Sequence, residues 1–136
     1  MHEIYRIIRR LGGTTKYKGY SELADAVKIA LEIQEIPVRT TKDIYPVLAR
    51  KYNCKPTTVE HNIRTLIEAC WDSNQKEFRK VAGCQLAFRP TNADLIDMLV
   101  YFIRNKNQME DEVWQEQAKR EAHQQRHQKE TDSRVL

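Results

Sequence analysis

The polar side chains best suited to chemistry share one face of a short segment between residues 57 and 68. At about 100° per residue, six of them lie opposite an apolar stripe if the segment is helical: Thr57, Thr58, His61, Arg64, Thr65 and Glu68. Arginine and histidine donate to guanine, glutamate accepts from cytosine N4, and threonine reaches a base or a phosphate. With Glu60 at its edge, this face favours DNA base reading by Thr58, Glu60, His61, Arg64 and Thr65. An ordinary polar helix surface, however, has the same composition.

Basic residues surround this segment. The chain has a formal net charge of +4, and residues 39–89 alone hold 10 Lys and Arg against 5 Asp and Glu. Such a concentration suits a polyanionic partner, although a solvated basic surface accounts for the charge equally well. If DNA is the partner, we expect one hydroxyl and five basic side chains to contact its phosphates: Thr57, Arg50, Lys51, Lys55, Lys80 and Arg89.

No other cluster in the sequence supports chemistry. His123 and His127 are spaced i, i+4, but they lie in a Gln-rich stretch without a third ligand, so no metal site is predicted. Cys54, Cys70 and Cys84 form no Cys-x-x-Cys pair, which argues against a zinc ribbon and against a disulfide scaffold. Without a nucleophile–base spacing or a Gly-rich phosphate loop, we expect neither an enzyme nor a bound cofactor.

The composition indicates one ordinary helical domain. A chain of 136 residues, 40% of them hydrophobic, can bury a core, and only four Gly and four Pro argue against a turn-rich β-sandwich. No run reaches the roughly 18 apolar residues of a membrane span, and no signal peptide is present at the N-terminus. The unpaired cysteines suit a reducing compartment, so we expect a cytoplasmic protein.

Helical periodicity predicts an all-α, bundle-like domain of six helices over residues 1–104. The helices are expected at about residues 2–11, 21–35, 41–52, 56–71, 74–82 and 91–103. Glycine should end the first and fifth helices at residues 12 and 83, and Pro37 should close the second. Hydroxyl caps are expected at Ser21, at Thr40 or Thr41 and at Thr91, and the fourth helix should begin at Pro56.

The third and fourth of these helices are typical of a helix-turn-helix, because a turn of about three to four residues joins two amphipathic helices. Ala49 occupies the position where the two helices approach most closely, and Asn53 suits left-handed turn angles. Val59 should hold the second helix against the first. Asn62 departs from the pattern, because the apolar side chain appears one residue later at Ile63, and we therefore expect a slightly rotated second helix.

A charged, Gln-rich tail follows over residues 105–136, with 6 Lys and Arg against 7 Asp and Glu. Its thin apolar line allows a helix but buries little, so the tail is predicted to be helical or disordered. We favour a frayed helical extension over a partner-binding coiled coil, with residues 131–136 loose. Trp71 is expected in the core, whereas Trp114 is either exposed or caps the core.

A set of short blocks distributed along the domain has a recognisable order and spacing. They are Lys18-Gly19-Tyr20, the run from Ile44 to Asn53, Val59-Glu60, Ile63-Arg64, Ile67-Glu68-Ala69, Trp71 and Arg89-Pro90-Thr91-Asn92. Over residues 1–104 this pattern resembles the C-terminal DNA-binding effector domain of the sporulation initiation response regulator of endospore-forming bacteria.

The resemblance implies a six-helix domain whose fourth helix reads a short DNA box, with copies bound at adjacent boxes as a homodimer on tandem sites. It also implies a contact with RNA polymerase through another surface. Glu60 and Arg64 match DNA-contact positions of the family, and Arg89 stands where the family has a lysine near the DNA backbone. Thr58 and His61 occupy positions where the family usually has arginine, so a different base preference is expected.

The response regulator carries a phosphoacceptor receiver domain before its effector, and no such signature occurs in these 136 residues. We therefore expect a stand-alone effector that is constitutively competent or is controlled by abundance or by a partner. The sequence favours a sequence-specific transcription regulator that reads the DNA major groove with residues 56–71. The alternative is a protein-interaction module that binds a full-length regulator or RNA polymerase without reading DNA.

Overall fold

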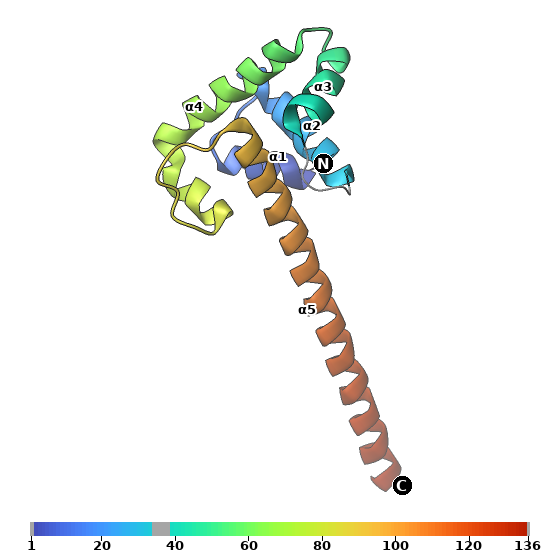
Figure 1. The fold of residues 1–136 in the computed structure, drawn as a ribbon. Helices are drawn as coiled ribbons and strands as arrows, with labels where there is room; N and C mark the ends of the chain where they lie inside the picture. Colours follow the sequence, from blue (N-terminus) through green and yellow to red (C-terminus); the bar gives the residue numbers. More distant parts are fainter. Residues whose placement is uncertain (1, 34–38, 136) are drawn as a thin grey trace. The chain divides into compact units, whose positions relative to one another are not determined.

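The elements of the chain are all helical in the ranges that the structure describes, so the predicted all-α class is confirmed (Figure 1). The computed structural model describes the backbone of residues 2–33 and 39–135, and beyond residue 106 it describes side chains only for residues 116–122. In chain order the elements are α1 (His2–Arg10), α2 (Gly19–Glu32), the π-helical turn η1 (Thr40–Ile44), α3 (Tyr45–Lys51), α4 (Pro56–Ala82) and α5 (Asn92–Val135).

The chain divides into two units, Met1–Ile103 and Arg104–Leu136. The first unit holds the hydrophobic core, to which all the helices of that unit contribute buried side chains. The second unit consists of the remainder of α5. Its described side chains between residues 116 and 122 are exposed, and Arg120 pairs there with Glu116 at 3.7 Å. Trp114, His123 and His127 lie outside the described side chains.

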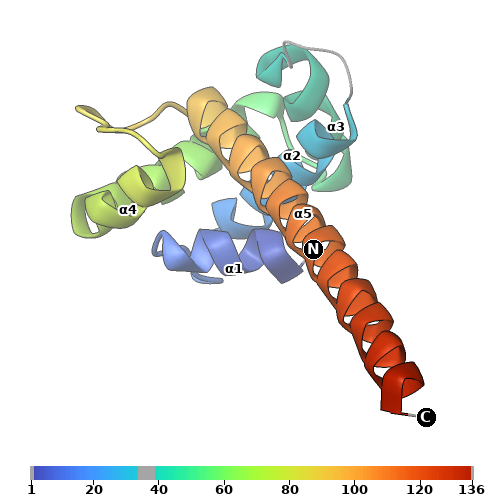
Figure 2. The ribbon, with the colours of Figure 1, turned by 90° about the horizontal axis from the view of Figure 1, so that it is seen from below.

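Helix α2 lies at the centre of the first unit and packs against α1, α3 and α4 (Figure 2). Five apolar side chains of α2 are almost completely buried, and three of them are alanines, which let the neighbouring helices approach closely: Leu23, Ala24, Ala26, Val27 and Ala30. Helix α1 covers one side of α2 with the predicted stripe of Ile4, Ile7 and Ile8. It ends at Gly12, as predicted, with a φ of 103°.

Several predicted boundaries and caps differ from the structure. Helix α2 begins at Gly19 without a side-chain cap, so the predicted cap at Ser21 is wrong. The same helix ends at Glu32, and the predicted terminator Pro37 lies outside the described residues. The third helix starts as the π-helical turn η1 with Arg39 at its N-cap and no side-chain cap, so the predicted cap at Thr40 or Thr41 is wrong. The backbone N–H of Arg39 donates to the Asp43 carboxylate at 2.9 Å.

The fourth and fifth predicted helices are joined in α4, which is continuous through a kink at Asn74 (φ −132°, ψ 26°). The prediction that residues 72–74 stop the helix is therefore wrong. The Asn74 side chain donates to the carbonyl of Cys70 at 3.0 Å, so this carbonyl has a hydrogen-bond donor at the point where the helix bends. Trp71 and Phe78 pack edge to face across the kink with ring centroids 5.3 Å apart, which confirms Trp71 as a core residue. Helix α4 ends at Gly83, as predicted, with a φ of 70°.

Helix α5 begins as the sequence predicts. The Thr91 hydroxyl accepts a hydrogen bond from the backbone N–H of Asp94 at 3.1 Å, which is a side-chain cap. Its first turns bury Leu95, Ile96 and Leu99 in the core of the first unit. The helix continues to Val135, so the expectation of loose chain from Thr131 is wrong over these residues.

Candidate nucleic-acid interface

The turn between α3 and α4 has the predicted helix-turn-helix geometry. Asn53 adopts a φ of 52°, and the backbone N–H of Cys54 donates to the carbonyl of Ala49 at 2.9 Å, so the chain reverses immediately after α3. Pro56 occupies the first turn of α4, where a missing N–H costs no helical hydrogen bond. Ala49 and Val59 are both buried, and α3 packs against α4, as the sequence predicts.

One face of α4 is apolar and buried, and the opposite face is polar and open to solvent. Val59, Ile63, Leu66 and Ile67 are at most 2% exposed, and they hold the helix against the core. The other face presents the predicted base-reading residues to solvent, and only Glu60 among them is half-buried: Thr58, Glu60, His61, Arg64 and Thr65. Thr57 is exposed in the first turn. The structure therefore brings the five predicted residues together on one accessible surface.

Three of these side chains form a connected group. Arg64 Nε lies 3.6 Å from Glu60 Oε1, and an Nη atom of Arg64 lies 3.2 Å from His61 Nδ1. Both contacts are at the protein surface, where an ion pair contributes little stability and exchanges readily for another partner. The group holds the arginine and the glutamate side by side, so neighbouring base edges can meet a donor and an acceptor from the same helical turn.

The segment before α5 flanks this face on one side. The Asn92 side chain donates to Tyr45 Oη at 3.0 Å and to the carbonyl of Glu60 at 2.9 Å, which ties the start of α5 to both helices of the motif. Burial raises the pKa of Tyr45, so its hydroxyl remains a neutral hydrogen-bonding group. Arg89 Nη2 lies 3.5 Å from Glu68 Oε1 and lines a hollow of about 330 Å³ together with Arg64. Arg89 is therefore close to the predicted base-reading residues.

The start of α2 flanks α4 on its other side. A Cβ atom on Gly19 would lie well inside 3.0 Å of the Asn62 carbonyl oxygen, so only glycine allows this approach of the two backbones. The Asn62 side chain donates to Glu22 Oε1 at 3.1 Å. Asn62 is thus a polar link between α4 and α2, which explains its departure from the apolar pattern. The sequence reasoning missed Glu22 as its partner, although the departure itself was visible.

The Glu22 carboxyl is buried, with 4% of the residue exposed. Its Oε2 atom is buried without a hydrogen-bond partner among the described residues. Burial raises the pKa of Glu22, and the hydrogen bond from Asn62 and the charge of Lys18 oppose this rise only in part. Lys18, in the basic loop between α1 and α2, is therefore a basic residue near the Glu22 carboxyl that the phosphate prediction did not include.

Two of the predicted phosphate contacts are engaged elsewhere. Lys51 Nζ lies 2.7 Å from the Oδ2 atom of Asp25, a nearly buried carboxylate that also accepts the hydroxyl of Tyr52. The hydrogen bond to Asp25 raises the pKa of Lys51. Lys80 lies beyond the kink of α4, 3.4 Å from Glu77, which also pairs with Arg10 at 2.6 Å.

The remaining predicted phosphate contacts lie near the reading face. Arg50 and Lys55 are exposed beside the turn, and the described residues give neither of them an ion-pair partner. In contrast, Lys80 lies 22 positions after Thr58 in α4, which at 1.5 Å per residue corresponds to about 33 Å of helix. Arg50 and Lys55 therefore lie beside the turn that leads into α4, and Arg89 lies beside Arg64, whereas Lys80 lies far along the helix.

No group of three potential metal ligands occurs among the described residues. Cys70 is buried, which raises the pKa of its thiol, and Cys54 packs partly against the core. No helix within the described ranges is both long enough and apolar enough to cross a membrane.

These observations define a helix-turn-helix domain whose second helix presents a donor-rich face between two basic flanks. Residues 4–103 match the family described as Sporulation initiation factor Spo0A C terminal, and the chain belongs to this family. It is a DNA-binding regulatory domain of the sporulation type, and the family is not one of enzymes.

Proposed function

We propose that this domain regulates transcription by reading a short DNA sequence in the major groove with the first half of α4. The observation that carries the proposal is the exposed group of Glu60, His61 and Arg64 on a helix whose opposite face is completely buried. A helix held in this way presents its polar side chains as a rigid set, and the N-terminal residues of a recognition helix meet base edges.

Each polar residue has a defined role in this proposal. Arg64 donates to the N7 and O6 acceptors of guanine, and Glu60 accepts from the N4 amino group of cytosine. His61 offers ring nitrogens where arginine would offer a bidentate fork, so its contact is weaker and discriminates less between bases. Thr58 and Thr65 complete the base-facing set.

The phosphate contacts come from both sides of the reading face. Arg50, Lys55 and Thr57 lie around the start of α4, and Arg89 lies on the flank formed by the segment before α5. Lys51 joins them only if it leaves Asp25, and we assign no DNA contact to Lys80 because of its distance along the helix. Phosphate contacts at the two edges of the groove would fix the register in which α4 reads the bases.

The proposal is tested with duplexes selected from a random oligonucleotide pool. Affinity for the selected duplex and for a scrambled one is measured over a range of salt concentrations for the native chain and for Arg64→Ala. We expect the native chain to prefer the selected duplex and Arg64→Ala to lose about 1–3 kcal/mol of that preference. Lys28→Ala, which removes an exposed cation of α2 away from the reading face, is the control. Unchanged discrimination in Arg64→Ala would contradict the assignment of α4.

Two further expectations from the resemblance remain proposals: binding of copies to adjacent boxes, and a contact with RNA polymerase. The first predicts that a duplex with two boxes binds two chains with a higher affinity than two isolated boxes do. Sedimentation of the complexes gives the stoichiometry. A domain that binds neither duplex but binds the polymerase would instead support the protein-interaction alternative.

A further inference from the structure

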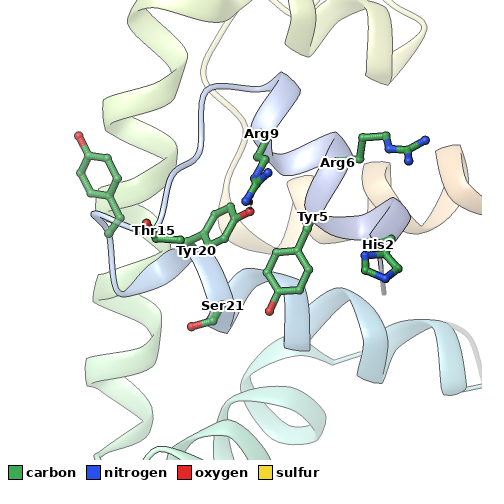
Figure 3. Close-up of a pocket in the computed structure, with 8 residues that line it drawn as sticks. His2, Tyr5, Arg6, Arg9, Thr15, Tyr20 and Ser21 are labelled. Atoms are coloured by element: carbon green, nitrogen blue, oxygen red, sulfur yellow. Dashed lines mark hydrogen bonds between the residues drawn. The ribbon is translucent and has the colours of Figure 1, made fainter.

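A groove of about 590 Å³ lies between α1 and the start of α2, outside the proposed DNA-reading face (Figure 3). Its volume is within the range of small-molecule sites, about 300–1,000 Å³. Two arginines, Arg6 and Arg9, line it together with one histidine and three tyrosines, and no carboxylate is among the lining residues. A groove with this lining favours an anion.

Arg9 is held in place for binding. Its Nε donates to the hydroxyl of Tyr20 at 2.8 Å, and Figure 3 shows its guanidinium directed toward that hydroxyl. This bond uses one of the five donors of the guanidinium, so the terminal nitrogens are left for a ligand. Arg6 extends away from the tyrosines at one end of the groove (Figure 3) and supplies a second positive charge. Guanidinium groups bind phosphate oxygens through charge-assisted, often bidentate hydrogen bonds.

Aromatic rings form the wall beside the arginines. Tyr5 and Tyr20 pack with ring centroids 5.1 Å apart, and Figure 3 shows the two rings side by side between α1 and α2. Tyr20 is 5% exposed and is part of the core, whereas Tyr5 is half-buried and can still contact a ligand. An aromatic face beside a guanidinium suits a ligand that joins a flat ring to a phosphate. Thr15 and Ser21 add hydroxyl groups to the lining.

We propose that the groove between α1 and α2 binds a small phosphate monoester that carries a flat ring, of the size of a nucleoside monophosphate. Arg9 binds the phosphate, Arg6 supplies a second positive charge at the end of the groove, and Tyr5 packs against the ring. The site is built from α1 and the first turn of α2, so it is separate from the side chains assigned to DNA.

The groove is connected to both helices of the DNA-reading motif. Gly19, next to Tyr20 in the chain, touches the α4 backbone at Asn62. Ser21 lies near the hydroxyl of Tyr52, the residue that follows α3. A ligand that tightens the first turn of α2 would therefore alter the support of α4, so we expect it to change DNA affinity. This part of the inference rests on the proposed function.

Binding is tested first without DNA. Isothermal titration of the full chain with adenosine monophosphate, inorganic phosphate and adenosine separates the phosphate and ring contributions. We expect one saturable site for adenosine monophosphate and at least about tenfold weaker binding of the other two probes. Guanosine, cytidine and uridine monophosphates extend the test to other rings. No saturable binding of any of the four monophosphates up to about 10 mM would overturn the proposal, because such a site would contribute less than about 3 kcal/mol.

Variants locate the site. Arg6→Gln removes an exposed charge and Arg9→Lys removes the guanidinium while keeping its charge, and each should weaken binding about tenfold or more. Lys28→Gln, an exposed cation of α2 that does not line the groove, should leave binding unchanged. If Arg9→Lys unfolds because the bond to Tyr20 is lost, Arg6→Gln decides the test. Binding that survives in both arginine variants would place the ligand elsewhere and overturn the assignment.

A second measurement determines whether the groove binds the phosphate of a small ligand or a phosphate of the DNA backbone. Duplex affinity is measured with and without saturating adenosine monophosphate, and again in Arg6→Gln. We expect the probe to shift duplex affinity of the native chain and to have no effect in the variant. If monophosphates fail to bind but Arg6→Gln lowers the salt dependence of duplex binding, the groove contacts DNA phosphates and the small-ligand proposal is wrong. Saturable ligand binding by a chain that binds no duplex would instead contradict only the proposed function.

Discussion

The side chain of Asn62 donates a hydrogen bond to Glu22 at 3.1 Å, and this bond joins α4 to the central helix α2. It is made at the edge of the core, beside the closest approach of the two backbones at Gly19. An apolar residue at position 62 would leave the buried Glu22 carboxyl without this hydrogen bond. The polar link instead fixes the rotation of α4, because a hydrogen bond is directional where apolar packing is not.

The buried Glu22 carboxyl should make stability depend on pH. Burial raises its pKa in the folded state, so the folded chain binds the proton more tightly than the unfolded chain does. The stabilisation is complete below the ordinary pKa of glutamate and is lost as the pH rises through the raised value.

We expect the unfolding free energy of the native chain to fall over this window relative to Glu22→Gln, which keeps the acceptor for Asn62. Urea titrations from acidic to neutral pH measure the difference, and the exposed Glu32→Gln is the control. Parallel pH profiles for the native chain and Glu22→Gln would contradict this prediction.

The contact at Gly19 should not tolerate a side chain. Gly19→Ala forces α2 away from the Asn62 carbonyl, and we expect a loss of about 1–3 kcal/mol of unfolding free energy together with weaker duplex discrimination. Gly83→Ala is the matched comparison, because its Cβ would meet nothing within 4 Å and only its left-handed φ opposes the change. It should cost about 1–2 kcal/mol of stability without altering discrimination. The close-contact argument fails if both variants discriminate between duplexes equally.

Lys51 and its neighbour Arg50 should differ in their effect on DNA binding. Lys51 pairs with Asp25, whereas Arg50 is exposed beside the turn. We expect Arg50→Ala to reduce the slope of log affinity against log salt by about 0.9, the value for one neutralised phosphate. Lys51→Ala should leave the slope unchanged and lower stability by less than about 1 kcal/mol, because the lysine side chain is 59% exposed. An equal reduction of the slope in the two variants would mean that Lys51 leaves Asp25 on binding.

Arg89 and Lys80 provide a second comparison of the same kind. Arg89 lines the hollow beside Arg64, and its ion pair with Glu68 is half-exposed and exchanges readily for a phosphate. Arg89→Ala should reduce the salt slope by about 0.9 on selected and scrambled duplexes alike, because a phosphate contact carries no sequence information. Lys80→Ala should leave both slopes unchanged. A reduced slope in Lys80→Ala would show that the DNA extends along α4 past the kink.

Local pattern was sufficient to predict the features that depend on one helix or one turn. The apolar period gives the buried stripe of α4 and hence the exposed positions of His61 and Arg64. Asn53 in the turn and the hydroxyl cap at Thr91 also follow from the chemistry of single residues. Whether those residues contact DNA stays a prediction, since exposure and charge are shared by many solvated helix surfaces.

The features that the sequence did not predict depend on contacts between segments far apart in the chain. Asn62 meets Glu22 and Lys51 meets Asp25 only because α2 passes between the other helices. The polar residues before Asn74 are typical of a helix end, but the Asn74 side chain binds the Cys70 carbonyl and the helix continues. Sequence patterns within a single helix cannot predict these pairings, because each pairing requires the packed arrangement of the helices.

The bend at Asn74 divides α4 into a first half with a solvent-exposed polar face and a second half that contacts α1 and the turn after it. Gly12 leaves room for the Asn74 side chain, and Glu77 is paired with Arg10, so the second half has a fixed rotation about its axis. Removing a single residue between Arg64 and Asn74 would consequently rotate the Arg64 position by about 100° relative to the second half of α4. The number of residues between the polar face of α4 and the bend therefore determines the direction in which that face points.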